Sequence, residues 1–185
     1  MTCDKRFMYF AKPSQERAYE TDIFYCEKTD GHWSEARKLG NAVNGKGSNE
    51  LSPCISPDGN TLYFASNREG GFGGYDIYIS RKDKNGNWSQ AVNAGRRINS
   101  PGDETNPFIH ADNHNLYFSS DGWKTIGGKD LFHLDLEDIK MKQPQNLRSD
   151  INTEGDEAEI YLLADGKTAY ASVFDSTERN YDICT

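Results

Sequence analysis

Short apolar runs, each bounded by turn-forming residues, recur along the whole chain. Between residues 51 and 92 they read LSPCIS (51–56), TLYFAS (61–66), YDIYIS (75–80) and NWSQAV (87–92). Runs of this length, rich in Tyr, Phe and Ile and without a helical period, predict β-strands, which we label A to D. Asp58-Gly59 separates the first two runs and Asn85-Gly86 the last two. Because these dipeptides favour tight hairpins, the segment predicts a four-stranded antiparallel meander.

The same pattern returns at a nearly constant spacing. A tyrosine in strand B recurs as Tyr9, Tyr63, Tyr117 and Tyr170, with spacings of 54, 54 and 53 residues. Other positions recur in step: Asp22, Asp76, Asp130 and Asp182 open strand C, and Glu50, Glu104 and Glu157 lie just before strand A. One meander cannot bury both of its faces, so neighbouring units must stack. A repeat of 53–55 residues therefore predicts an all-β fold, a partial β-propeller of about 3.5 blades.

The repeat also sets the expected organisation of the chain. We expect one propeller domain over residues 1–185, with blades at approximately 1–44, 45–99, 100–152 and 153–185. The first unit begins at strand B and the last ends inside strand C, which gives fourteen strands. Closed propellers have about four to eight blades of four strands. Three interpretations remain open: a piece of a longer protein, a ring completed by a partner chain, or a compact arc.

Charge and cysteine content exclude some functions. The net charge is −8, and an acidic chain is poorly suited to bind nucleic acid, so no nucleic-acid partner is expected. No apolar run is long enough to span a membrane, and no signal peptide is visible. The cysteines, Cys3, Cys26, Cys54 and Cys184, form no CxxC pair, so we expect no metal site, although a disulfide remains open. No cofactor is expected either.

Loop lengths point to one candidate binding face. In a meander, the D-to-A and B-to-C loops emerge on the same face, and here they are the long ones, for example 40–50, 66–74 and 95–106. Unrepeated Arg, Lys and aromatic residues in these loops are of the types enriched in interface hot spots. The candidate partner-binding residues are Arg68, Phe72, Arg96, Arg97, Trp123 and Lys124.

Residues present in every unit favour a structural role instead. We expect Asp22, Asp76, Asp130 and Asp182 to accept hydrogen bonds from backbone amides of the B-to-C loop. The glycine-rich loop 70–74 connects two strands, whereas a phosphate-binding loop leads into a helix, so it is interpreted as a structural turn. A ring of carboxylates from Glu50, Glu104 and Glu157 at the central channel is an alternative cation site.

Two stretches, SPDGNTLYFASNR and GGYDIY, give the repeat a recognisable form. The chain resembles the TolB-like (WD40-like) β-propeller repeat over essentially its whole length. The run INSPGDETNPFIHADNHNLYFSSDG is similar to the form of this repeat in OmpA-family and lipoprotein cell-envelope proteins of Bacteroidetes-like bacteria. The first and fourth units lack the double-glycine loop. The resemblance implies a periplasmic or outer-membrane-associated repeat protein.

The resemblance also implies a function: a non-catalytic scaffold for protein–protein interaction, with an envelope protein partner near peptidoglycan and no membrane span. The sequence contains no Gly-x-Ser-x-Gly nucleophile motif, so we expect that the chain is not an enzyme. The alternatives are a glycan-binding module and a fragment of a propeller glycoside hydrolase or peptidase. Further blades or a second chain would be needed to close the ring.

Overall fold

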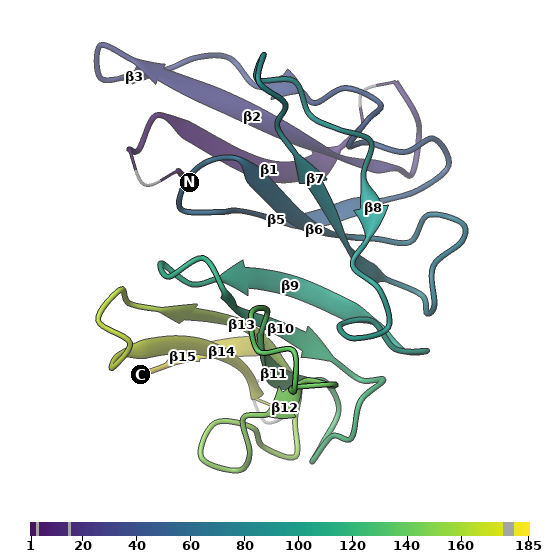
Figure 1. Cartoon of the computed structure of the whole chain (residues 1–185), viewed down its shortest axis with the longest axis vertical. Coiled ribbons are helices and arrows are strands. Elements are labelled where there is room, and N and C mark those ends of the chain that lie inside the picture. Colours follow the sequence, from purple (N-terminus) through teal and green to yellow (C-terminus); the bar gives the residue numbers. More distant parts are fainter. Residues whose placement is uncertain (3, 15, 176–179) are drawn as a thin grey trace.

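The chain forms four antiparallel β-sheets in a propeller arrangement (Figure 1). This computed structural model describes residues 1–2, 4–14, 16–175 and 180–185. The first sheet contains β1 (Phe7–Pro13), β2 (Thr21–Thr29), β3 (His32–Trp33) and β4 (Arg37–Lys38), and the second β5 (Glu50–Ile55), β6 (Thr61–Ser66), β7 (Asp76–Arg81) and β8 (Val92–Asn93). The third contains β9 (Glu104–Ile109), β10 (Asn115–Ser120), β11 (Asp130–Asp135) and β12 (Gln145–Asn146), and the fourth β13 (Glu157–Leu162), β14 (Ala169–Asp175) and β15 (Asn180–Cys184).

The repeat positions occupy equivalent places in the sheets. Tyr63 on β6 pairs with Cys54 and Ile79, and Tyr117 on β10 pairs with Phe108 and His133. Both tyrosines therefore lie on the second strand of a complete meander. The predicted all-β propeller fold is confirmed.

The predicted fourth strand of the second unit, 87–92, is wrong in its extent. Trp88 forms only an isolated bridge with Lys82, and β8 begins at Val92. Between them, the Ala91 amide donates to the Ala42 carbonyl (2.8 Å), in the loop that joins β4 to β5. The chain moves away from β7 to make this contact, so the predicted strand D is interrupted between Trp88 and Val92.

Each sheet has two apolar faces, which we name by their neighbours. The leading face packs on the next sheet in the chain, and the trailing face packs on the preceding one. Ile77 and Tyr63 of the second sheet's leading face pack in one core with Leu116 and Phe118 of the third sheet's trailing face. The same arrangement joins the first sheet to the second, and the third to the fourth. Stacking of sheets therefore supplies the core.

The four sheets form an open arc among the described residues. Strands contact each other between consecutive sheets, and no contact joins the described strands of the first sheet to those of the fourth. The leading face of the fourth sheet is consequently uncovered: Tyr161, Tyr170 and Ile183 are 56%, 42% and 76% exposed. Ile77 and Leu131, at the repeat position of Ile183, are 0% exposed. A face that is a blade interface elsewhere in the molecule is open here.

Candidate functional site

The B-to-C loop of each complete unit interlocks with the following D-to-A loop. The Tyr75 amide donates to Asp103 Oδ1 (2.8 Å), and the Glu104 amide donates to the Tyr75 carbonyl (2.7 Å). Gly73 lies against the Gly102 backbone, where a Cβ atom would overlap the carbonyl. Loops of both kinds therefore share one face, which we call the loop face, and the glycines permit their close approach.

The repeated aspartates of the second and third sheets accept bonds from their own B-to-C loop. Asp76 accepts from the amides of Phe72 (2.6 Å) and Gly73 (3.3 Å), and from Asn93 Nδ2 (3.0 Å). Asp130 has equivalent bonds to two loop amides and to an asparagine of β12. Their carboxylates are buried and satisfied by these donors.

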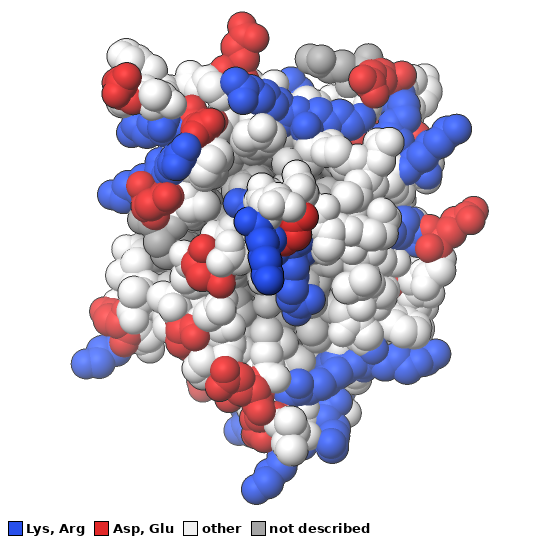
Figure 2. Space-filling model, turned by 45° about the horizontal axis from the view of Figure 1, so that its top comes forward, with Lys and Arg blue, Asp and Glu red and all other residues white. Residues whose placement is uncertain are grey.

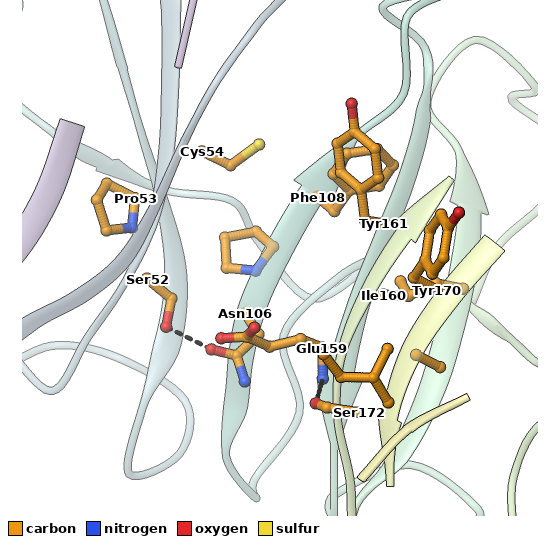
Figure 3. Close-up of a pocket in the computed structure, with 13 residues that line it drawn as sticks. Ser52, Pro53, Cys54, Asn106, Phe108, Glu159, Ile160, Tyr161, Tyr170 and Ser172 are labelled. Atoms are coloured by element: carbon orange, nitrogen blue, oxygen red, sulfur yellow. Dashed lines mark hydrogen bonds between the residues drawn. The ribbon is translucent and has the colours of Figure 1, made fainter. Parts of the chain in front are cut away.

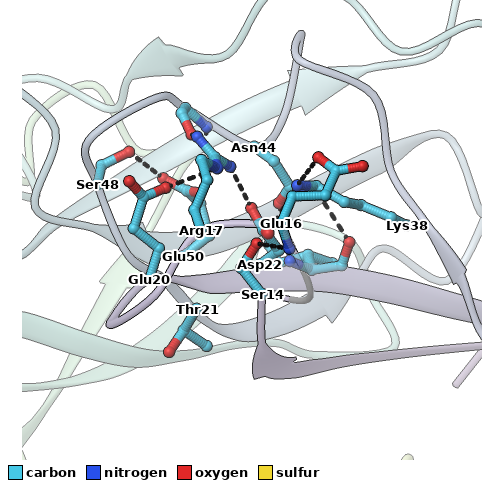
Figure 4. Close-up of polar contacts among 12 residues, drawn as sticks. Ser14, Glu16, Arg17, Glu20, Thr21, Asp22, Lys38, Asn44, Ser48 and Glu50 are labelled. Atoms are coloured by element: carbon cyan, nitrogen blue, oxygen red, sulfur yellow. Dashed lines mark hydrogen bonds and ion pairs between the residues drawn. The ribbon is translucent and has the colours of Figure 1, made fainter.

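In the first sheet, which lacks the glycine loop, Asp22 has cationic partners instead (Figure 4). Arg17 Nη2 and Lys38 Nζ each lie 2.7 Å from its carboxylate. Burial alone would raise the pKa of Asp22, but the hydrogen bond and charge of Lys38, with Ser14 and Arg17, hold it below the usual value. In the fourth sheet, Asp182 is exposed, and part of the preceding segment, 176–179, lies outside the described residues.

The repeated glutamates at the start of strand A are fully buried, which leaves no open ring of carboxylates. Glu104 accepts from the hydroxyls of Ser100 (2.5 Å) and Ser120 (2.6 Å) and from the Ser100 amide (2.9 Å). Glu50 accepts from Ser48, Ser66 and Arg68. Burial raises the pKa of Glu104, and the serine bonds oppose this effect. These side chains tie the D-to-A loop to strand B.

Three of the six candidate partner-binding residues have partners within the chain. Arg68 Nη2 donates to the Val43 carbonyl (2.6 Å) and to Glu50, and Trp123 Nε1 donates to the Ile98 carbonyl (2.9 Å). The Arg97 guanidinium donates to four backbone carbonyls, those of Asp135, Leu136, Asp138 and Met141. In each case the side chain ties a loop to a neighbouring segment.

The other three candidates are more accessible. The Arg96 guanidinium is exposed and lies over the half-buried Phe72 ring, 4.5 Å from its centroid. Lys124 is exposed as well. On the side of the molecule drawn in Figure 2, basic and acidic side chains are interspersed rather than gathered into a field of one sign.

A cleft near the inner strands was not found by sequence reasoning. It has a volume of about 410 Å³ and is lined by residues of β5, β9, β13, β14 and β15 (Figure 3). Ser52 (φ 48°) and Asn106 (φ 51°) adopt left-handed backbone conformations at bulges in β5 and β9. The Ser52 hydroxyl bonds to Asn106, whose Nδ2 donates to the Ala158 carbonyl (2.7 Å). A proline follows each of these two residues. Because proline within a strand indicates a bulge, the sequence contains a signal for both irregularities.

The chemistry lining this cleft, which we call the inner cleft, is mixed. The rings of Phe108 and Tyr161 lie 5.2 Å apart between centroids, and Glu159 and Ser172 supply polar groups. Among the described residues, no group of three or more His, Cys, Asp or Glu side chains could hold a metal ion. Cys26, Cys54 and Cys184 are free thiols, whereas Cys3 lies outside the described part of the chain.

Comparison with known proteins gives the fold and little more. No family model matches the chain, and no curated protein is similar to it in sequence. The structure of TolB from Acinetobacter baumannii matches it with a TM-score of 0.59 at 18% identity, over 100% of this chain and 42% of that one. A putative TolB from Agrobacterium tumefaciens matches with a TM-score of 0.63 at 12% identity, over 94% of this chain and 52% of that one. The chain thus spans about half the length of these TolB-like propellers.

Enzymes share the fold, which corrects one prediction. A puromycin hydrolase matches with a TM-score of 0.56 at 14% identity, over 98% of this chain and 29% of that one. An endo-arabinanase from Bacillus licheniformis matches with a TM-score of 0.57 at 16% identity, over 96% of this chain and 67% of that one. The prediction that the chain is not an enzyme is therefore contradicted, since this propeller occurs in proteins of both kinds. The absence of a Gly-x-Ser-x-Gly motif concerns one class of hydrolase and does not distinguish the two kinds of protein.

Proposed function

We propose that this chain is a protein–protein interaction scaffold of the bacterial cell envelope that binds its partner through the loop face. The observation that carries the proposal is the exposed Arg96 side chain stacked on Phe72. Arginine and aromatic residues dominate interface energetics, and these two are held on interlocked loops rather than used to close the fold. A preorganised pair loses little conformational entropy when it binds.

The envelope setting rests on the resemblance to TolB-like repeats and on the fold shared with the two TolB structures. The proposed location is the periplasm or the outer-membrane surface, with a peptidoglycan-associated protein as the partner. The described part of the chain contains no helix that could cross a membrane. Further blades or a second chain would complete the ring by covering the open leading face of the fourth sheet.

The test is capture of partners from an envelope extract by the immobilised chain. We expect the double variant Phe72→Ala, Arg96→Ala to weaken capture by about 1 to 3 kcal/mol, as hot-spot truncations do. The matched control is Asn60→Ala with Asn85→Ala, in the short hairpins between strands A and B and between C and D. Equal loss from both double variants would contradict a single binding face.

A second candidate function is glycan binding in the inner cleft. Phe108, Tyr161 and Tyr170 supply aromatic surfaces there, and Glu159 and Ser172 supply polar groups for sugar hydroxyls. Titration with soluble envelope polysaccharides tests it, because Tyr161→Ala would then reduce binding while Phe72→Ala would not. Binding that is insensitive to Tyr161→Ala would rule out the inner cleft as the site.

A further inference from the structure

A second cleft lies beside the outer edge of the third sheet, and all its ionisable lining residues are basic. It has a volume of about 570 Å³ and follows β12, the outermost strand of that sheet, labelled in the lower part of Figure 1. Lys124, Lys142 and Arg148 line it, together with the uncharged Gln143, Gln145 and Trp123. We call it the basic cleft. The chain as a whole has a net charge of −8, so this group of positive charges is a local departure from its overall charge.

The three cations have no carboxylate partner within the described part of the chain. The ion pairs of the molecule involve other residues, chiefly Arg6, Arg17, Lys38, Arg68 and Lys129. Lys124, Lys142 and Arg148 are exposed and are left to pair with an external anion. Because they surround a concavity, their charges act together on anything bound inside it.

The repeat shows that two of these cations are not needed for the fold. The Arg148 carbonyl accepts from the amides of Ile151 and Asn152, as the Gly95 carbonyl accepts from Ile98 and Asn99 in the second sheet. Both residues have positive φ, 62° for Arg148 and 84° for Gly95. Glycine suits this conformation better than arginine does. The position of Lys124, six residues before Asp130, is also occupied by glycine in the second sheet, where Gly70 lies six residues before Asp76.

We propose that the basic cleft binds an extended acidic peptide segment of a protein partner. This rests on the proposed function and names the chemistry of the partner. An extended chain fits because the cleft includes the edge strand β12, beside which the amide side chains of Gln143 and Gln145 can bond the backbone of a neighbouring strand. An acidic chain fits because three unpaired cations would form charge-assisted bonds with its carboxylates. Complementary charge would also favour encounter and register.

The experiment uses the whole chain and a labelled glutamate-rich peptide, with glutamine-rich and lysine-rich peptides of equal length as controls. Fluorescence anisotropy should show binding of the acidic peptide alone, weakening as salt rises and screens the charges. The triple variant Lys124→Ala, Lys142→Ala, Arg148→Gly should lose at least about tenfold in affinity. Lys84→Ala, an exposed lysine in the C-to-D hairpin, is the matched control and should bind normally.

The single variant Arg148→Gly separates recognition from folding. This variant introduces glycine, the residue that the second sheet has at the equivalent position (Gly95). Its melting temperature should therefore equal or exceed that of the parent chain, while its affinity for the acidic peptide falls. Unchanged affinity in the triple variant would overturn the proposal. Binding of phosphatidylglycerol vesicles or of an acidic polysaccharide in place of the peptide would overturn it too. Capture of an envelope protein that depends on Phe72 and Arg96 but not on the three cations would leave the proposed function intact and remove this inference.

Discussion

Near the start of strand C, the repeated aspartate has three different environments among the four sheets. In the second and third sheets the carboxylate accepts bonds from loop amides, in the first it pairs with Arg17 and Lys38, and in the fourth it is exposed. A buried carboxylate needs donors or cations to replace water. Loss of the double glycine in the first unit is thus matched by two basic residues.

Replacement of Asp76 by Ala should lower the free energy of unfolding by about 1 to 3 kcal/mol, because the amides of Phe72 and Gly73 and the Asn93 side chain would lose their acceptor. Thermal or urea unfolding measures the effect. Asp182→Ala is the matched control, since this exposed carboxylate at the same repeat position should contribute less than about 0.5 kcal/mol. Similar losses in the two variants would contradict the structural role of Asp76.

At the scale of strands and loops, the sequence predicts correctly those elements that depend on local residue type. The strand 61–66 and the hairpins at Gly59 and Gly86 follow from residue type, and both glycines have positive φ. The predicted extent of strand D is wrong because the Ala91 amide bonds to Ala42, in the loop between β4 and β5. The partners of Arg97 lie about forty residues further along the chain, so only the folded structure reveals that its guanidinium is occupied.

The contact between the third and fourth sheets contains a titratable group. His110, which follows β9, has Nδ1 2.8 Å from Asp112 Oδ2 and Nε2 3.1 Å from the Leu163 carbonyl, beyond β13. Both ring nitrogens face acceptors, so the doubly protonated imidazolium satisfies both. The bond to Asp112 raises the pKa of His110 above 6.5, and burial opposes this.

A raised histidine pKa predicts the direction of a pH effect. The contribution of His110 is fully present below the pKa of the unfolded chain, about 6.5, and is lost as pH rises through the higher pKa of the folded state. His110→Gln should therefore be more destabilising at about pH 5.5 than at about pH 8. The difference between parent and variant is the quantity to measure, since burial lowers the pKa of His133 and gives the opposite trend in both proteins. A difference independent of pH would contradict this assignment.

For the whole molecule, stability depends on how many faces of the sheets are covered. Three leading faces pack on a following sheet, and the fourth is open. The internal repeat places isoleucine at the same position in a covered and in an uncovered face, at Ile77 and Ile183. The two residues therefore allow one substitution to be compared in two environments.

Ile77→Ala should cost about 2 to 5 kcal/mol, because it leaves a cavity between two packed sheets. Ile183→Ala should change stability by less than about 0.5 kcal/mol, since its side chain is 76% exposed. Urea unfolding of the isolated chain at low concentration, with sedimentation velocity to establish that it is monomeric, measures both. A large cost for Ile183→Ala that grows with protein concentration would show that another copy covers the face. A large cost at every concentration would show that the arc closes on itself, contrary to the open arrangement of the four sheets.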